Sequence, residues 1–437
     1  MRGLIVVLAV LGCGSHTSEP ASSSAGSSAT PATAHPAPVS APAAPAGSGA
    51  HGGGDSTTTT APAASSTDGY DFTEVGRALF AVGACGGPIP PEYDQATVEN
   101  HCRQVTQVQN DYHAKWVTRA RAFFAEKVPA NVPKVVVYPF AGGDLSTALT
   151  VYPDADEITT MSLEPAGDPR TLAAMVTAPS SAPSKSAKPA KRGNPALARA
   201  LATVHKELRF LYRVNFSNTL NMIEAMRGGA LPTQLIFGLS ALKVHGYEVV
   251  GLRYFKLDEN GAIKYLTAED VAAAPAVTSG KNQARNEVFA NAELRFRKPG
   301  GRVQVYRHIQ VNLDNTHMTK DPRVLRHLES KGTVAGMTKA ASYLLSWPGF
   351  SMIRDYLIGH VAWMVSDATG VAPKWGKPAG YEYETYGGFV APHISAGDGI
   401  AADWRREFAA QPHRALGFRF GYYDNNLVNH LVVMRKK

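Results

Sequence analysis

The chain has 437 residues, of which 44% are hydrophobic, and this composition is ample for a large core and excludes a chain too polar to fold. Its formal net charge is +8, which in a cytosolic protein would suggest nucleic acid as a partner. We expect no nucleic acid here, because the first residues indicate export and the positive charge then points to anionic envelope surfaces.

The N-terminus carries the most specific signal. Arg2 precedes the apolar run Leu4–Leu11, which is too short to span a bilayer, and the stretch Val10-Leu11-Gly12-Cys13 resembles the lipobox of bacterial lipoproteins. The resemblance implies a signal peptide over residues 1–12, lipid on Cys13 and a membrane partner reached through that lipid. Gly14 rather than Asp follows the cysteine, which favours the outer membrane over the inner membrane of the cell envelope. An ordinary secretory signal is the alternative.

Residues 13–68 consist almost entirely of Ala, Ser, Thr, Pro and Gly. Such a segment buries too little apolar surface to offset its ordering entropy, so we predict a disordered, lipid-anchored tether with a reach of about 40 Å. Residues 69–437 are then predicted to form a single α/β domain, with a flexible basic loop at 177–194. In an exported domain Cys85 and Cys102 are expected to form a disulfide, the alternative being two buried thiols.

Apolar spacing predicts the first elements of the domain. Val98–Phe124 has the three- and four-residue steps of one helical face, and Val135–Tyr138 is a continuous apolar run typical of a strand covered on both faces. Asp144 is placed to cap a helix over Leu145–Tyr152, and Ile158–Leu163 is a second strand.

Further elements follow in chain order. We predict a helix that begins at Pro195, a helix at Thr219–Met226, a helix at Leu231–His245, a strand at Tyr247–Leu257, a hairpin turn at Asp258–Gly261, and strands at Ala292–Arg297 and Arg302–Leu313. In the last of these strands Val303, Val305 and Ile309 alternate with polar residues, which indicates a sheet with one covered face.

The C-terminal third is predicted to contain helices at Pro322–Leu328, Thr338–Ser346, Phe350–Met364 and Ile400–Ala409, an aromatic, glycine-rich segment at Tyr381–Val390, and strands at Leu416–Tyr422 and Leu427–Met434. Alternating helices and strands followed by hairpins predict an α/β fold: a three-layer mixed sheet with a Rossmann-like first β-α-β unit and antiparallel hairpin additions.

The turn Gly142-Gly143-Asp144 and the residue Glu164 form a candidate small-molecule site. This stretch resembles, in outline, the first β-α-β unit of Rossmann-like methyltransferases, which implies that the glycines approach a cofactor and that the acidic residue holds a ribose. The G-x-G-x-G spacing is absent, and adenosylmethionine is not normally available outside the cytoplasm, so no cofactor is predicted. In the alternative interpretation the glycines make a tight turn, Asp144 caps a helix and Glu164 ends a strand.

Three motifs resemble an uncharacterised family of bacterial envelope proteins: YPFAGGD at residues 138–144, LEPAG at 163–167 and KAASYL at 339–344. The resemblance implies a shared fold, and its family-like positions suit either a binding cleft or a set of buried polar residues. Those positions are Tyr138, Asp144, Glu164, Lys339, Ser342, Tyr343, Asp367 and Tyr386. The predicted ligand-binding residues are Tyr138, Gly142, Gly143, Asp144, Glu164, Lys339 and Tyr343.

Signatures of catalysis are missing from the sequence, which has no G-x-S-x-G, no H-E-x-x-H and no Walker loop. His308, Asp314 and His317 could reach one metal ion, but single histidines on a strand and a loop more often face solvent, so no metal is predicted. We therefore predict a domain that binds a small molecule or an envelope component without catalysis. The alternative is an enzyme that uses the Gly142–Asp144 turn and Glu164.

Overall fold

The computed structural model describes residues 69–177, 194–215, 231–279, 281–389, 399–421 and 429–437. Ser65–Lys437 form one compact unit. The predicted signal peptide, Cys13 and the tether lie outside the described residues, as do nearly all of the basic loop and the helix predicted at Thr219–Met226. Within the described ranges, no helix is both long and apolar enough to cross a membrane.

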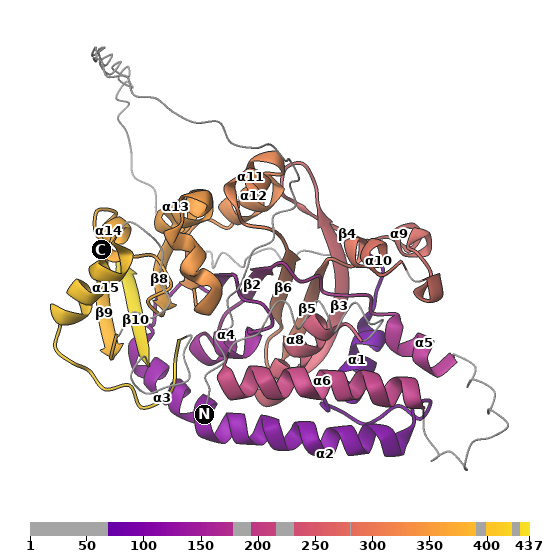
Figure 1. Cartoon of the computed structure of the whole chain (residues 1–437). Coiled ribbons are helices and arrows are strands. Elements are labelled where there is room, and N and C mark those ends of the chain that lie inside the picture. Colours follow the sequence, from indigo (N-terminus) through magenta and orange to yellow (C-terminus); the bar gives the residue numbers. More distant parts are fainter. Residues whose placement is uncertain (1–68, 178–193, 216–230, 280, 390–398, 422–428) are drawn as a thin grey trace, which may run out of the picture. The chain divides into compact units, whose positions relative to one another are not determined.

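In the described part of the chain, ten strands form one mixed sheet in the order β4-β3-β5-β6-β2-β1-β7-β8-β10-β9 (Figure 1). The strands are β1 (Val135–Pro139), β2 (Glu157–Ser162), β3 (Glu248–Leu257), β4 (Ile263–Tyr265), β5 (Asn291–Arg297), β6 (Gln304–Gln310), β7 (Val334–Met337), β8 (Val361–Ser366), β9 (Tyr381–Gly387) and β10 (His430–Lys436). The predicted α/β class is confirmed.

The centre of the sheet is parallel. β6 pairs with β2, β2 with β1, β1 with β7 and β7 with β8, all in the parallel sense. In chain order these five strands are the third, second, first, fourth and fifth, so the direction of winding reverses between β1 and β7. Antiparallel strands extend both edges, with β5, β3 and β4 beyond β6 and with β10 and β9 beyond β8.

Helices surround this sheet. They are α1 (Thr73–Val82), α2 (Gln95–Tyr112), α3 (Thr118–Lys127), α4 (Leu145–Val151), α5 (Thr171–Thr177), α6 (Pro195–Val214), α8 (Thr233–Val244), α9 (Ala268–Ala273), α10 (Asn282–Val288), α11 (Asn315–Lys320), α12 (Arg323–Glu329), α13 (Ser351–His360), α14 (Pro373–Gly376) and α15 (Ile400–Ala409). A π-helical turn at His113–Val117 joins α2 to α3, and a 3-10 segment at Ala340–Ser346 follows β7.

Side chains alternate between the two faces of the central strands, and each face has its own core. Val136 and Tyr138 of β1 pack with residues of α1 to α6 and of α8, whereas Val137 packs with residues of α11 to α15. In Figure 1, α2, α6 and α8 accordingly lie on one side of the sheet, and α11 to α13 lie on the other. The continuous apolar run that predicted a doubly covered strand is therefore explained.

The C-terminal third differs from its prediction. The helix predicted over Phe350–Met364 is α13 followed at once by strand β8, and the helix predicted at Thr338–Ser346 is a 3-10 segment preceded by the unpredicted strand β7. Residues 416–421 form no strand. These errors matter because Lys339 and Asp367, which belong to the site described below or border it, follow β7 and β8.

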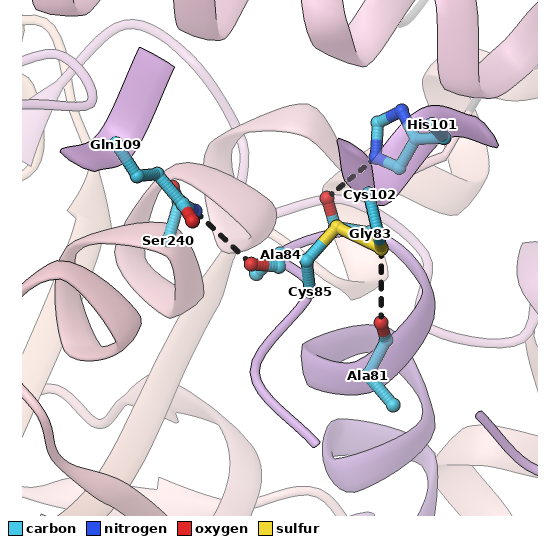
Figure 2. Close-up of a disulfide and its surroundings, with 8 residues drawn as sticks. All are labelled: Ala81, Gly83, Ala84, Cys85, His101, Cys102, Gln109 and Ser240. Atoms are coloured by element: carbon cyan, nitrogen blue, oxygen red, sulfur yellow. Dashed lines mark hydrogen bonds between the residues drawn. A yellow bond between two sulfur atoms is a disulfide. The ribbon is translucent and has the colours of Figure 1, made fainter. Parts of the chain in front are cut away.

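The predicted disulfide between Cys85 and Cys102 is confirmed, with Cα atoms 5.3 Å apart (Figure 2). It ties the segment after α1 to α2, and closing a loop of this length stabilises a fold by about 3 kcal/mol. Side chains of α2 also bind carbonyl groups at the end of α1: His101 Nε2 lies 3.0 Å from the oxygen of Gly83, and Gln109 donates to Ala84. These bonds satisfy carbonyls that the helix leaves unpaired.

Candidate functional site

The turn after β1 is shaped by its contact with α8. Gly142 has a φ of +51°, in the left-handed region that favours glycine, and its carbonyl accepts a 2.8 Å hydrogen bond from Gln234 Nε2. A Cβ on Gly143 would lie 2.0 Å from the Phe237 ring, so only glycine fits there. Both glycines therefore serve the packing of the turn against α8.

Asp144 follows this turn and has two roles. Its Oδ1 accepts hydrogen bonds from the backbone N–H (3.3 Å) and the hydroxyl (2.7 Å) of Thr147, which confirms the predicted cap of α4. Its Oδ2 accepts the Tyr138 hydroxyl at 3.1 Å and forms an ion pair with the ammonium of Lys339. Asp144 is 2% exposed, so this ion pair is buried.

Lys339 comes from the other side of the point where the strand order reverses. It follows the end of β7 by two residues, and its ammonium contacts Asp144. Its side chain is 1% exposed, and its Nζ also donates to Thr147 Oγ1 at 2.9 Å. Burial lowers the pKa of Lys339, against the opposing effect of the Asp144 carboxylate. We call Tyr138, Asp144, Thr147 and Lys339 the Lys339 cluster.

The Lys339 cluster occupies the place where open α/β sheets usually hold a ligand, the carboxyl ends of the strands beside the reversal of strand order. Asp367, after β8, borders it and accepts the backbone N–H groups of Ala340 (3.1 Å) and Thr369 (2.9 Å). The Lys339 amine is committed to two protein oxygens, so it is not available as a nucleophile or base in this arrangement.

Glu164 lies in a second buried group, two residues past the end of β2. Its side chain is 0% exposed, and neither carboxylate oxygen has a hydrogen-bond partner in the part of the chain that the structure describes. Only its backbone carbonyl is bound, by the Nε2–H of His308 at 2.7 Å. A fully buried carboxylate without a bond is rare and costly.

His308 connects Glu164 to the glycine turn. Because its Nε2 must donate to the carbonyl of Glu164, its Nδ1 is the acceptor, and it lies 3.1 Å from Gln234 Nε2 and 3.3 Å from the Thr160 hydroxyl. Burial lowers the pKa of His308 to about 4, so the ring is neutral at physiological pH. We call Thr160, Glu164, Gln234 and His308 the Glu164 cluster.

The prediction that His308 faces solvent is wrong, because the polar face of its strand is covered as well as the apolar face, on which Ile309 is buried. Gln304, Tyr306 and His308 of β6 are buried, whereas Val303, just before the strand, is 48% exposed. The reason is that β6 is an inner strand whose polar face packs against α8. His317 is exposed and bonds to Asp314 instead, and no three His, Cys, Asp or Glu side chains among the described residues are placed to hold a metal.

The structure brings together only some of the predicted residues. Tyr138, Asp144 and Lys339 are in contact, with Ser342 beside them accepting the Lys339 backbone N–H at 3.0 Å. Glu164 belongs to its own cluster. Tyr343 is partly buried and packs on Trp347, with ring centres 6.0 Å apart, and Tyr386 packs on Phe123.

Sequence reasoning missed Gln234, Thr147 and the role of His308. Gln234 had a usable signal, because it is a polar residue within a helix whose other residues are nearly all apolar and buried. Comparisons with protein families, with curated proteins and with solved structures found no match for this chain. The chemistry of the site is therefore argued from its own residues.

Proposed function

We propose that this chain is a lipid-anchored cell-envelope protein whose α/β domain binds a small molecule with two neighbouring hydroxyl groups at Glu164, without catalysis. The observation that carries the proposal is the buried Glu164 carboxylate, neither oxygen of which has a partner among the described residues. An ionised carboxylate only accepts hydrogen bonds, so its complement is a ligand that donates two of them. A vicinal diol, as in a sugar or a ribose, has that chemistry.

Neighbouring orphaned acceptors support the same class of ligand. Gln234 Oε1 and Ser162 Oγ are also buried without a hydrogen-bond partner among the described residues. Ser162 and Glu164 follow one another on the same face of β2 and its continuation, with Thr160. A site rich in unsatisfied oxygen atoms favours a ligand rich in O–H donors over an anion or an apolar molecule.

The strand order supports the location. The parallel strands run third, second, first, fourth and fifth across the sheet, which is the order of doubly wound nucleotide-binding folds, and we infer a Rossmann-like organisation of this centre. In such folds an acidic side chain beyond the second strand binds ribose hydroxyls, the position that Glu164 takes here.

An enzyme resembling methyltransferases in outline is the second candidate, and the strand order is the observation that favours it. Gly142 and Gly143, which would have to approach the cofactor, instead pack against Gln234 and Phe237. These residues do not fit adenosylmethionine at the turn, so we derive no reaction from it. Binding without turnover is the function that the geometry supports better.

Ligand binding is tested with the full chain carrying Cys13→Ala, which removes the expected lipid. We expect adenosine or a hexose to raise the melting temperature, with 2′-deoxyadenosine as the matched compound that lacks the diol. A shift with adenosine alone identifies a ribonucleoside ligand, and a shift with the hexose alone identifies a sugar. Diol recognition would be contradicted if adenosine and 2′-deoxyadenosine raise the melting temperature equally and the hexose does not raise it.

Glu164→Met should stabilise the ligand-free protein by about 1–3 kcal/mol, because it removes a buried carboxylate that has no hydrogen bond. The same change should abolish the ligand-induced shift, since the acceptor is gone. Urea unfolding measures the first effect and thermal shift the second. Glu126→Met, at an exposed position of α3, is the control. A large loss of stability in the Glu164 variant would mean that the carboxylate is structural.

Cys13→Ala should move the chain from the membrane fraction to the soluble fraction. Each buried methylene of an acyl chain contributes ~0.8 kcal/mol, so loss of the acyl chains removes the anchor. Cell fractionation followed by immunoblotting measures the distribution, with Ser15→Ala as the control substitution two residues away. If the Cys13 variant stays with the membranes, the lipid anchor is refuted.

A further inference from the structure

A cavity of about 340 Å³ lies at the opposite end of the parallel strands from Glu164. It is formed by α3, by the residues that lead into β1 and by the segment between α4 and β2. Its walls are mainly apolar and include Phe124, Val128, Val132, Val151 and Tyr152. A mostly apolar cavity of this size, with few polar groups at its edge, is typical of a small-molecule site.

Arg121 on α3 gives this cavity a positive charge. Its guanidinium donates to Nδ1 of His245 at 2.8 Å, and its Nε is buried without an acceptor. Among the residues that the structure describes, no carboxylate lies within 4 Å of it. Cationic side chains that are partly buried normally have an acidic partner, so this charge lacks its usual complement.

The histidine beside Arg121 cannot supply that complement. His245 is 3% exposed, accepts the Arg121 proton at Nδ1 and lies with Nε2 3.1 Å from the Ser146 carbonyl. Burial, and then the Arg121 charge, hold the pKa of His245 well below its ordinary range, so the ring is neutral.

A second cation strengthens the positive potential. The Lys298 ammonium donates to the His245 carbonyl and lies 4.6 Å from the centre of the Tyr247 ring, and it too has no ion pair within the described ranges. Lys134 and the exposed Asp154 also line the cavity and offset each other. Among the residues that line the cavity, Arg121 therefore carries the excess positive charge, and Lys298, which does not line it, adds a second positive charge beside His245.

We propose that this cavity, which we name the Arg121 cavity, binds an anionic amphiphile, a molecule with an apolar chain that ends in a carboxylate or a phosphate. The anionic group would accept the free N–H donors of Arg121, whose planar fork suits carboxylate and phosphate oxygens. The apolar chain of the ligand would lie along Phe124, Val132 and Tyr152. The site is separate from Glu164. Its ligand is an anion with an apolar chain, whereas the ligand proposed at Glu164 is a donor of hydroxyl hydrogen bonds.

The test uses the full chain with Cys13→Ala, so that no detergent is needed. The four probes are decanoate and decyl phosphate, both below their micelle-forming concentrations, together with decanol and inorganic phosphate. Isothermal titration calorimetry measures binding of each probe. We expect decanoate or decyl phosphate to bind at least tenfold more tightly than decanol and inorganic phosphate. The stronger of the two anionic probes identifies the head group.

Two variants locate the binding. Arg121→Met should reduce the affinity for the anionic probe at least tenfold, whereas the same change at the exposed Arg119 of α3 should leave it unchanged. Ala125→Trp, at an exposed position that lines the cavity, should block binding while leaving the Arg121 charge in place. The proposal would be overturned if neither anionic probe binds, or if decanol or inorganic phosphate binds as tightly as the anionic probe. It would also be overturned if the Arg121→Met and Ala125→Trp variants bind the anionic probe as tightly as the parent protein does.

Discussion

Lys339→Met is expected to lower the free energy of unfolding by about 3–5 kcal/mol, because it leaves the buried Asp144 carboxylate without its counter-charge. Asp367, which also lies near Lys339, would lose a favourable charge as well. Asp144→Asn should cost a similar amount by stranding the buried ammonium. Urea unfolding of the full chain, followed by circular dichroism, measures both values.

The double variant Asp144→Asn, Lys339→Met separates the ion pair from the packing. Removing both charges leaves neither member of the pair uncompensated, although Asp367 still loses the charge of Lys339, and Asn can still accept hydrogen bonds from Thr147. The double variant should therefore lose less stability than the two single losses added together. Additive losses would show that the two charges do not depend on each other. Single losses below about 1 kcal/mol would contradict the buried ion pair itself.

Lowering the pH from 8 to 5 is expected to cost about 4 kcal/mol of stability through His308 and His327, beside a further loss through the buried His245, whose pKa is also lowered. Burial lowers the pKa of His308 to about 4, and burial followed by the charge of Lys331 lowers that of His327 to about 4. Each ring titrates near 6.5 when unfolded, so its stabilising contribution is complete above pH 6.5 and is lost as the pH falls toward 4. Each histidine contributes ~2 kcal/mol of this loss by pH 5.

Thermal unfolding across this range measures the effect, and substitutions identify its source. His308→Gln keeps a donor for the Glu164 carbonyl, and His327→Asn keeps one for the Gly261 carbonyl, where the ring now lies at 3.0 Å. Because His245 still titrates, the double variant should keep part of the pH dependence but should lose about 4 kcal/mol less stability than the wild type between pH 8 and 5. His113→Gln, at an exposed position, should leave the pH dependence unchanged. A wild-type melting temperature that stays constant down to pH 5 would refute the buried neutral histidines.

Local signals explain which parts of the fold could be predicted. The strand β1, the Asp144 cap, α4 and β2 follow one another within a short stretch. Each is encoded by its own residues: an apolar run for β1, a capping side chain for α4 and the β-branched run Ile158-Thr159-Thr160 for β2. The same holds for α6, which begins at Pro195, and for α15. Such elements need no information from distant parts of the chain.

The strands β7 and β8 were missed for a physical reason. The chain passes directly from helix to strand at His360 and Val361, with no turn residue between the two elements and only Gly359, inside the last helical turn, to mark the change. The apolar spacing of α13 therefore continues into β8 and imitates a longer helix. β7 is only four residues long and contains Gly336, and its strand state depends on the pairing with β1 and β8.

The candidate site could be predicted in part. A resemblance of motifs grouped Tyr138, Asp144 and Lys339, and the structure places them in contact. The partners of Glu164 could not be predicted, because the polar face of the strand, which carries His308, was expected to meet solvent. Alternation indicates two faces, but on an inner strand both are covered, so polarity alone does not say which residues meet solvent.

The Asp144–Lys339 pair also imposes an order on assembly. Lys339 follows Thr147, its second partner, by 192 residues, so a ribosome needs roughly 10–40 seconds to make the intervening chain. Until then the first strand and its helix carry an uncompensated acid at what will become the middle of the sheet. The N-terminal half of the domain therefore cannot bury Asp144 beside its counter-charge before Lys339 has been made. Contacts between residues so far apart in the sequence predict that the domain folds slowly. The incomplete chain then needs protection from aggregation for a longer time.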